Sequence, residues 1–153
     1  MAYVFNVIIA QSLTTDAFFV AEKSVWHYAG GGVWKHPGNS GEPGVVKKTF
    51  VLNGSGTCGA LRFANEKGEY LVAVLGIHND RVWVDVASDL GPSDVLGQIL
   101  PKWYDGGPYS TVSPSGRVRK NTSGGKLVDM NVTQRSGSTV EVFITIGNNE
   151  EVQ

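Results

Sequence analysis

The sequence lacks three features: an excess of charge of either sign, a second cysteine, and a long apolar run. Thirteen Lys and Arg residues against 14 Asp and Glu residues give a net charge of −1 at pH 7. This balance offers no electrostatic basis for binding nucleic acid or an anionic membrane surface. No stretch approaches the roughly 18 apolar residues of a membrane-spanning helix. These shortages exclude nucleic-acid-binding and helical membrane proteins.

The single cysteine, Cys58, rules out a disulfide within the chain and favours a reducing compartment. Residues 1–11 lack the basic segment of a secretory signal peptide, and Asn6 interrupts an already short apolar run. We therefore expect a cytoplasmic protein.

Glycine and alternating apolar residues are abundant. Twenty glycines and six prolines indicate many turns between short strands, and 153 residues suit one domain, 1–153.

A helical pattern covers 95–103, with a cap at 92–94 and Pro101 as the residue that ends or kinks it. The polar segments 35–47 and 105–125 are expected to be variable surface loops. Alternation and β-branched content predict nine strands, at about 3–10, 18–28, 33–34, 48–52, 59–64, 69–76, 81–87, 127–133 and 140–146. The pattern predicts a mainly β sandwich with a helical insertion.

The stretch 53–63 is rich in glycine, and Gly54, Gly56 and Gly59 match the G-x-G-x-x-G fingerprint of dinucleotide-binding proteins. That fingerprint requires a helix after the glycines, whereas residues 60–64 alternate as a strand. The alternative is a bend between two strands, which would expose backbone N–H groups and the Ser55 hydroxyl. We prefer the bend.

The sequence shows no pattern that indicates catalysis or metal binding. Ser55 does not lie in a G-x-S-x-G elbow, and although His78 and Asp85 are the nearest candidates for a base and its orienting group, spacing alone does not make a triad. His27, His36 and His78 are scattered without metal-ligand spacing. We expect no catalytic residue, no bound metal and no cofactor.

Polar and small residues gather at three predicted turns: Ala29-Gly30-Gly31, Ser55-Gly56 and His78-Asn79. Turns at one end of a sandwich meet in space, and amides, a hydroxyl, a carboxamide and nearby aromatic rings can together bind a neutral sugar. The same residues also suit turns that have no further role. The residues alone leave both interpretations open.

Four segments resemble the fungal fruit-body lectins: 22–31 with Trp34, 54–63, 76–79 with Trp83 and Asp85, and 144–147. The resemblance covers most of residues 3–147. It implies an actinoporin-like β-sandwich with a short helix-loop-helix connection, assembled into tetramers.

The resemblance also implies two carbohydrate sites. The second site would bind N-acetylglucosamine-type sugars through Asp85, Val86 and Ser88, the last replacing the usual threonine. An arginine and a tyrosine would come from the region after the helix, where Tyr109, Ser110 and Arg117 lie without an assigned role. The first site would bind the T-antigen disaccharide Gal-β-GalNAc through Ala29, Gly30, Ser55, Gly56, His78 and Asn79. In this site Gly30 stands where the resemblance leads us to expect an asparagine.

The implied function is a multivalent, metal-independent lectin that cross-links glycans of glycoproteins or glycolipids in defence. The alternative from the same fold is a membrane-acting cytolysin. A cytolysin needs an amphipathic N-terminal helix, whereas residues 3–10 alternate as a strand, so we expect no membrane insertion. A plain scaffolding domain is the third possibility.

Overall fold

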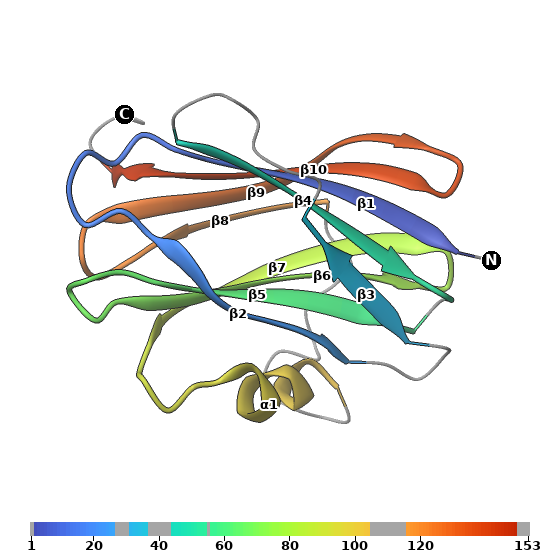
Figure 1. Ribbon diagram of the computed structural model, residues 1–153, viewed down its shortest axis with the longest axis horizontal. Helices are drawn as coiled ribbons and strands as arrows, with labels where there is room; N and C mark the ends of the chain where they lie inside the picture. Colours follow the sequence, from blue (N-terminus) through green and yellow to red (C-terminus); the bar gives the residue numbers. More distant parts are fainter. Residues whose placement is uncertain (1, 27–30, 37–43, 55, 105–115, 150–153) are drawn as a thin grey trace.

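The computed structural model describes residues 2–26, 31–36, 44–54, 56–104 and 116–149, which form two stacked β-sheets and one short helical segment (Figure 1). The predicted mainly β sandwich is confirmed. In chain order the elements are β1 (Tyr3–Gln11), β2 (Phe19–Trp26), β3 (Gly32–Lys35), β4 (Val45–Leu52), β5 (Cys58–Ala64), β6 (Tyr70–His78), β7 (Arg81–Leu90), α1 (Leu96–Ile99), the 3-10 helix η1 (Leu100–Trp103), β8 (Arg117–Asn121), β9 (Lys126–Ser136) and β10 (Thr139–Asn148).

The two sheets differ in size and connectivity. The six-stranded sheet has the order β3-β4-β1-β10-β9-β8, and the four-stranded sheet has the order β2-β5-β6-β7. β1 pairs antiparallel with β4 on one side and parallel with β10 on the other. The first strand of the chain therefore lies in the middle of the larger sheet, beside the last.

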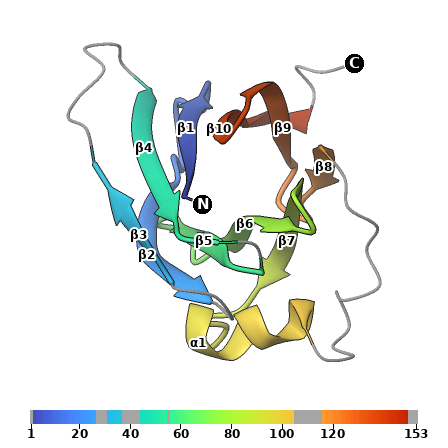
Figure 2. The ribbon, with the colours of Figure 1, turned by 90° about the vertical axis from the view of Figure 1, so that its right-hand side faces the viewer.

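The main core lies between the sheets, where the alternating strands place their apolar residues. In β1 the predicted inward face of Tyr3, Phe5, Val7 and Ile9 is buried, as the alternation predicts. A second apolar cluster lies on the opposite face of the four-stranded sheet, between this sheet and the segment formed by α1 and η1. Figure 2 shows α1 against that face, on the side away from the six-stranded sheet. Every residue of β5 is buried, because β5 has the core on one face and the helical segment on the other.

Two predicted loops contain more strand than expected. β4 begins at Val45, within the segment 35–47, and β8 lies within the segment 105–125. The described residues thus form ten strands rather than nine. The sequence Arg-Val-Arg-Lys-Asn of β8 has no apolar alternation because this strand pairs only with β9 at the sheet edge, and most of its residues are exposed.

The helical pattern over 95–103 is real, but its predicted cap is wrong. Val95 occupies the cap position without a side-chain hydrogen bond, and the Leu96 N–H instead donates to Oε1 of Glu22 on β2, at 2.8 Å. The α-helix ends at Ile99 and continues as η1, which contains Pro101, as expected of a residue that lacks an N–H.

The resemblance implies a helix-loop-helix connection, and its described part is the single segment formed by α1 and η1. Residues 105–115 lie outside the described residues. Of the described helices, none is long and apolar enough to cross a membrane.

Candidate functional site

The three polar turns singled out in the sequence are joined to one another at one end of the sandwich. The Asn53 N–H donates to the carbonyl of Gly31 at 2.9 Å. The Gly56 N–H donates to the carbonyl of Ile77 at 2.7 Å, and the Ile77 N–H donates to the carbonyl of Thr57 at 3.3 Å. These bonds link the segment after β2, the bend between β4 and β5, and the end of β6.

The glycine-rich stretch is a bend between β4 and β5, as preferred above, and no helix follows it. Gly56 has φ +91°, a conformation that favours glycine. At Gly59 a Cβ would lie 2.7 Å from the ring of Phe50, so this position is glycine because an aromatic ring packs against the backbone. Backbone geometry and packing therefore explain two of the three fingerprint glycines without a nucleotide.

Asn79 is presented to solvent at the tip of the β6–β7 hairpin. His78 and Arg81 form the last pair of the hairpin, leaving the two-residue turn Asn79-Asp80. Both turn residues have positive φ, 50° and 60°, as a type I′ turn requires. The Asn79 carboxamide is exposed, with Nδ2 3.4 Å from Nε2 of the exposed His78. Its donor and acceptor atoms can therefore reach a ligand.

The predicted first-site residues fall into two groups. Gly56, His78 and Asn79 are described, and the Gly56–Ile77 bond brings the bend next to β6, which ends at His78 just before Asn79. Ala29, Gly30 and Ser55 lie outside the described residues.

Aromatic rings adjoin this end of the four-stranded sheet. Trp26, Cys58, Gly76 and Trp83 form one row across its four strands. A Cβ on Gly76 would lie 2.9 Å from Nε1 of Trp83, so the indole lies over this glycine. Trp26 and Trp83 are both half-buried. This row follows from the register of the three strand pairs.

Residues of the predicted second site lie along β7, but their side chains do not all converge. Asp85 is buried against η1, and its two oxygens accept hydrogen bonds from the Val86 N–H and from Nε1 of Trp103, each at 2.8 Å. The Val86 side chain lies on the other face of the sheet, in the core between the sheets. Ser88 is half-buried further along the strand.

The region after the helix contributes little to this second cluster among the described residues. Tyr109 and Ser110 lie outside the described residues. Arg117 is on β8 of the other sheet, where Nη2 lies 2.7 Å from Oδ2 of Asp129.

His78 and Asp85 are not arranged as a base and its orienting group. Asp85 bonds to Val86 and Trp103, whereas His78 is exposed at the hairpin end. Ser55 lies outside the described residues. Within the ranges that the structure describes, no group of three His, Cys, Asp or Glu side chains could hold a metal ion.

Comparison with known proteins gives the same family as the motifs. The family model "Fungal fruit body lectin" matches residues 1–153. The lectin of Boletus edulis is 34% identical over 154 residues, covering 99% of this chain and 96% of that protein. The solved structure of the wild-type lectin XCL from Xerocomus chrysenteron superposes with a TM-score of 0.83 at 30% identity, covering 95% of this chain and 99% of that one.

A more distant structural neighbour is the lipid-binding protein Nakanori, with a TM-score of 0.57 and 11% identity, covering 94% of this chain and 70% of that one. At this identity the likeness shows the fold alone. The whole-chain family match and the two fungal relatives are specific, and lectins of this kind bind carbohydrate without catalysing a reaction. The chain belongs to the fungal fruit body lectin family and is a carbohydrate-binding protein, not an enzyme.

Proposed function

We propose that the protein binds Gal- and GalNAc-containing glycans of the T-antigen type at the joined turns, through Ala29, Gly30, Ser55, Gly56, His78 and Asn79. The observation that carries this proposal is the set of backbone bonds that place the bend at Gly56 beside the strand ending at His78 and the exposed Asn79.

The chemistry of these residues suits a neutral sugar. The Asn79 carboxamide both donates and accepts, so it can bond two neighbouring hydroxyls of one ring. Glycines at 30 and 56 allow the ring to approach the backbone, and the Ser55 hydroxyl adds another partner. Because Gly30 replaces the asparagine that the resemblance implies, one side-chain contact is lost.

A second, N-acetylglucosamine-type site at Asp85, Val86 and Ser88 is part of the proposal. Each Asp85 oxygen has one described hydrogen bond and retains a lone pair that could accept a sugar hydroxyl. Since Val86 faces the core, its contribution would come from its backbone rather than its side chain.

Multivalency follows from the expected affinity. A shallow site with a few hydrogen bonds that compete with water gives about −4 to −8 kcal/mol, which is roughly mM to µM. Several sites on one particle convert this into useful avidity, and a symmetric tetramer supplies them. We infer a metal-independent tetramer that cross-links surface glycans in defence.

We also propose a cytoplasmic location, because the only cysteine is a free, buried thiol.

Glycan-array binding of the purified protein tests the first site. We expect binding to Gal-β-GalNAc-terminated glycans that falls at least tenfold in Asn79→Ala, since about 1.4 kcal/mol is a factor of ten. Ser55→Ala should weaken binding in the same direction. Glu66→Ala, an exposed change in the β5–β6 turn at the other end of the sheet, is the control and should bind normally. Binding that is indifferent to Asn79→Ala and Ser55→Ala would reject this site.

The membrane-acting alternative is disfavoured by the position of β1. An inserting N-terminal helix would have to leave a strand that is paired on both sides, with β4 and with β10. Leakage from glycan-free vesicles measures this directly, and we expect none. Lysis without added glycan would overturn the view that the protein acts only as a lectin.

A further inference from the structure

The turn that carries Asn79 has an unusual residue at its second position. Type I′ turns favour asparagine at the first central position and glycine at the second, because both have positive φ. Asn79 follows this preference, but Asp80 stands where glycine is expected, with φ 60°. Aspartate tolerates this conformation better than most residues, though less well than glycine. A contact to its side chain stabilises the turn further.

That contact comes from the opposite sheet. The Tyr3 hydroxyl, from β1, donates to Oδ1 of Asp80 at 2.7 Å. Nη2 of Arg135, from β9, donates to the same oxygen at 2.8 Å, and Nη1 donates to the Asp80 carbonyl at 2.7 Å. Arg135 therefore holds both the side chain and the backbone of Asp80.

Arg135 is itself fixed. Its Nε donates to the carbonyl of Gly137 at 2.9 Å, so all three guanidinium nitrogens have a partner. Gly137, with φ 60°, lies in the turn between β9 and β10. We call the contacts of Tyr3 and Arg135 with Asp80 the anchor. The anchor joins the tips of two hairpins, one from each sheet.

The exposure of these groups indicates what the anchor does. The Asp80 side chain is 71% exposed and that of Arg135 is 31% exposed, so water and salt screen their attraction. Exposed ion pairs add little to the stability of the fold. The Tyr3 hydroxyl is the sheltered member of the network, because Tyr3 is buried. A network whose ion pair stabilises little but which fixes one exposed turn at several atoms acts mainly on orientation.

We propose that Asp80, held by Arg135 and Tyr3, is a positioning residue that fixes the Asn79 turn in the orientation that binds sugar. This inference rests on the proposed first site. It makes that site depend on the six-stranded sheet, although its described ligand residues belong to the four-stranded sheet and the bend that enters it. Preorganisation of this kind raises affinity by lowering the ordering cost of binding.

Asp80→Gly is the sharpest test, because glycine suits the positive φ and removes only the anchoring side chain. We expect the affinity for Gal-β-GalNAc, measured by isothermal titration calorimetry, to fall about 3- to 10-fold. The thermal unfolding midpoint should change by less than about 3 °C. Asp80→Asn keeps an acceptor for Tyr3 and Arg135 and should restore most of the affinity.

Arg135→Met should weaken binding similarly, and Asp80→Gly/Arg135→Met should be little worse than either single change, because both remove one network. The matched control is Asp129→Asn, which alters an Arg–Asp pair of like geometry, 2.7 Å, between β8 and β9. It should leave sugar affinity unchanged.

The outcomes separate the two proposals. If the unaltered protein binds no Gal- or GalNAc-terminated glycan, the first site itself is wrong. If it binds and Asp80→Gly binds equally well, the positioning role is overturned. A loss of affinity matched by a large fall in the unfolding midpoint, without rescue by Asp80→Asn, would also overturn it, because the role would then be structural.

Discussion

At the scale of single residues, Phe50 shows how the core determines the residues around it. Its ring is fully buried, lies 4.7 Å from the ring of Trp34 in a stacked arrangement, and is 6.2 Å from the ring of Phe5. A Cβ on Gly59 would lie 2.7 Å from this ring, and a Cβ on Gly32 would lie 3.1 Å from it and 2.8 Å from the Val51 carbonyl oxygen. The ring thus accounts for Gly59, and the ring and the neighbouring backbone together account for Gly32.

Gly59→Ala is expected to destabilise the fold by about 1–3 kcal/mol, because a Cβ would lie 2.7 Å from buried ring atoms of Phe50. Urea unfolding followed by tryptophan fluorescence measures the change. Gly97→Ala is the control. It lies in α1 with nothing within 4 Å of the added Cβ, and alanine favours helix by about 0.8–1 kcal/mol, so its effect should have the opposite sign. Equal effects of the two changes would contradict this account.

Cys58 is expected to be unreactive in the folded protein. Burial raises the pKa of its thiol to about 11, against a smaller opposing effect of the Tyr104 hydrogen bond. Only the thiolate reacts, so the raised pKa leaves very little reactive Cys58 at pH 7. A thiol-specific chromogenic reagent should label Cys58 only after denaturant is added. Rapid labelling without denaturant would show that the site is open.

At the scale of elements, the short helix depends on the sheet beneath it. Isolated helices of this length do not form in water. α1 and η1 pack Leu96, Ile99, Leu100 and Trp103 onto the sheet, and Trp103 also bonds to Asp85. The chain leading to the helix is held by Nη2 of Arg62, which donates to the Pro92 carbonyl at 2.9 Å.

Glu22→Ala is expected to cost about 1 kcal/mol, because it leaves the Leu96 N–H at the helix start without its carboxylate partner. Glu22→Gln keeps an acceptor and should cost less. Thermal unfolding of both variants gives the comparison. If the two changes were equally mild, the cap would have no energetic role.

Regular elements were predictable where one face of a strand meets the core. The alternation of β1 and β10 identified both strands and their buried faces. β8 was missed because Val118 is its single apolar residue, and the helix cap was missed because Glu22 lies 74 residues before Leu96. Local patterns do not reveal partners that only folding brings together.

The sequence singled out the turns of the candidate site, and the described bonds between Gly31, Asn53, Gly56 and Ile77 join the bend to the neighbouring segments. The role of these turns in binding sugar stays a prediction. The anchor of the Asn79 turn was not foreseen, since Tyr3 and Arg135 lie 77 and 55 residues from Asp80. Likewise, Asp85 gave no local signal that Trp103 would cover it.

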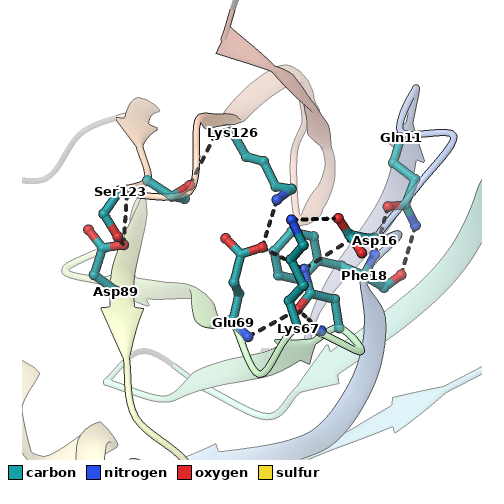
Figure 3. A network of polar contacts seen from close by, with 10 residues as sticks. Gln11, Asp16, Phe18, Lys67, Glu69, Asp89, Ser123 and Lys126 are labelled. Atoms are coloured by element: carbon teal, nitrogen blue, oxygen red, sulfur yellow. Dashed lines mark hydrogen bonds and ion pairs between the residues drawn. The ribbon is translucent and has the colours of Figure 1, made fainter.

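At the scale of the whole molecule, polar contacts join the two sheets at the end away from the turns of the first site (Figure 3). Nζ of Lys126, from the six-stranded sheet, lies 2.6 Å from Oε1 of Glu69, which also accepts from Asn65. Beside them, the Ser123 hydroxyl and N–H both donate to Oδ1 of Asp89. Lys126 is buried, and Glu69 supplies the partner that a buried ammonium group needs.

Glu69 is expected to make stability fall in acid. Burial alone would raise the pKa of Glu69, but the hydrogen bonds from Lys126 and Asn65, with the charges of Lys126 and Lys67, outweigh it and lower the pKa. A lowered pKa gives stability that is complete above the ordinary value, about 4.3, and is lost as pH falls through the folded-state pKa.

Glu69→Gln should therefore be about 1–3 kcal/mol less stable at pH 7, with the difference shrinking towards pH 3. Urea unfolding at several pH values measures the difference. The exposed variant Glu66→Gln should follow the unaltered protein at every pH. A Glu69→Gln deficit that stayed constant with pH would show that the carboxylate charge is not the cause.

The parallel pairing of β1 with β10 also sets the order in which the protein can fold during synthesis. Val4 lies opposite Thr139 and Gln11 opposite Ile146. One hydrogen-bonding edge of β1 therefore stays unpaired until residues more than a hundred positions later have been translated. Until then β1 has only β4 as a neighbour in its sheet, and its other edge is unpaired. Pairings this distant in sequence make folding slow and leave strand edges open to other chains. We therefore expect the larger sheet to close only after β10 has left the ribosome, which gives nascent chains that stop before β10 a strong tendency to aggregate.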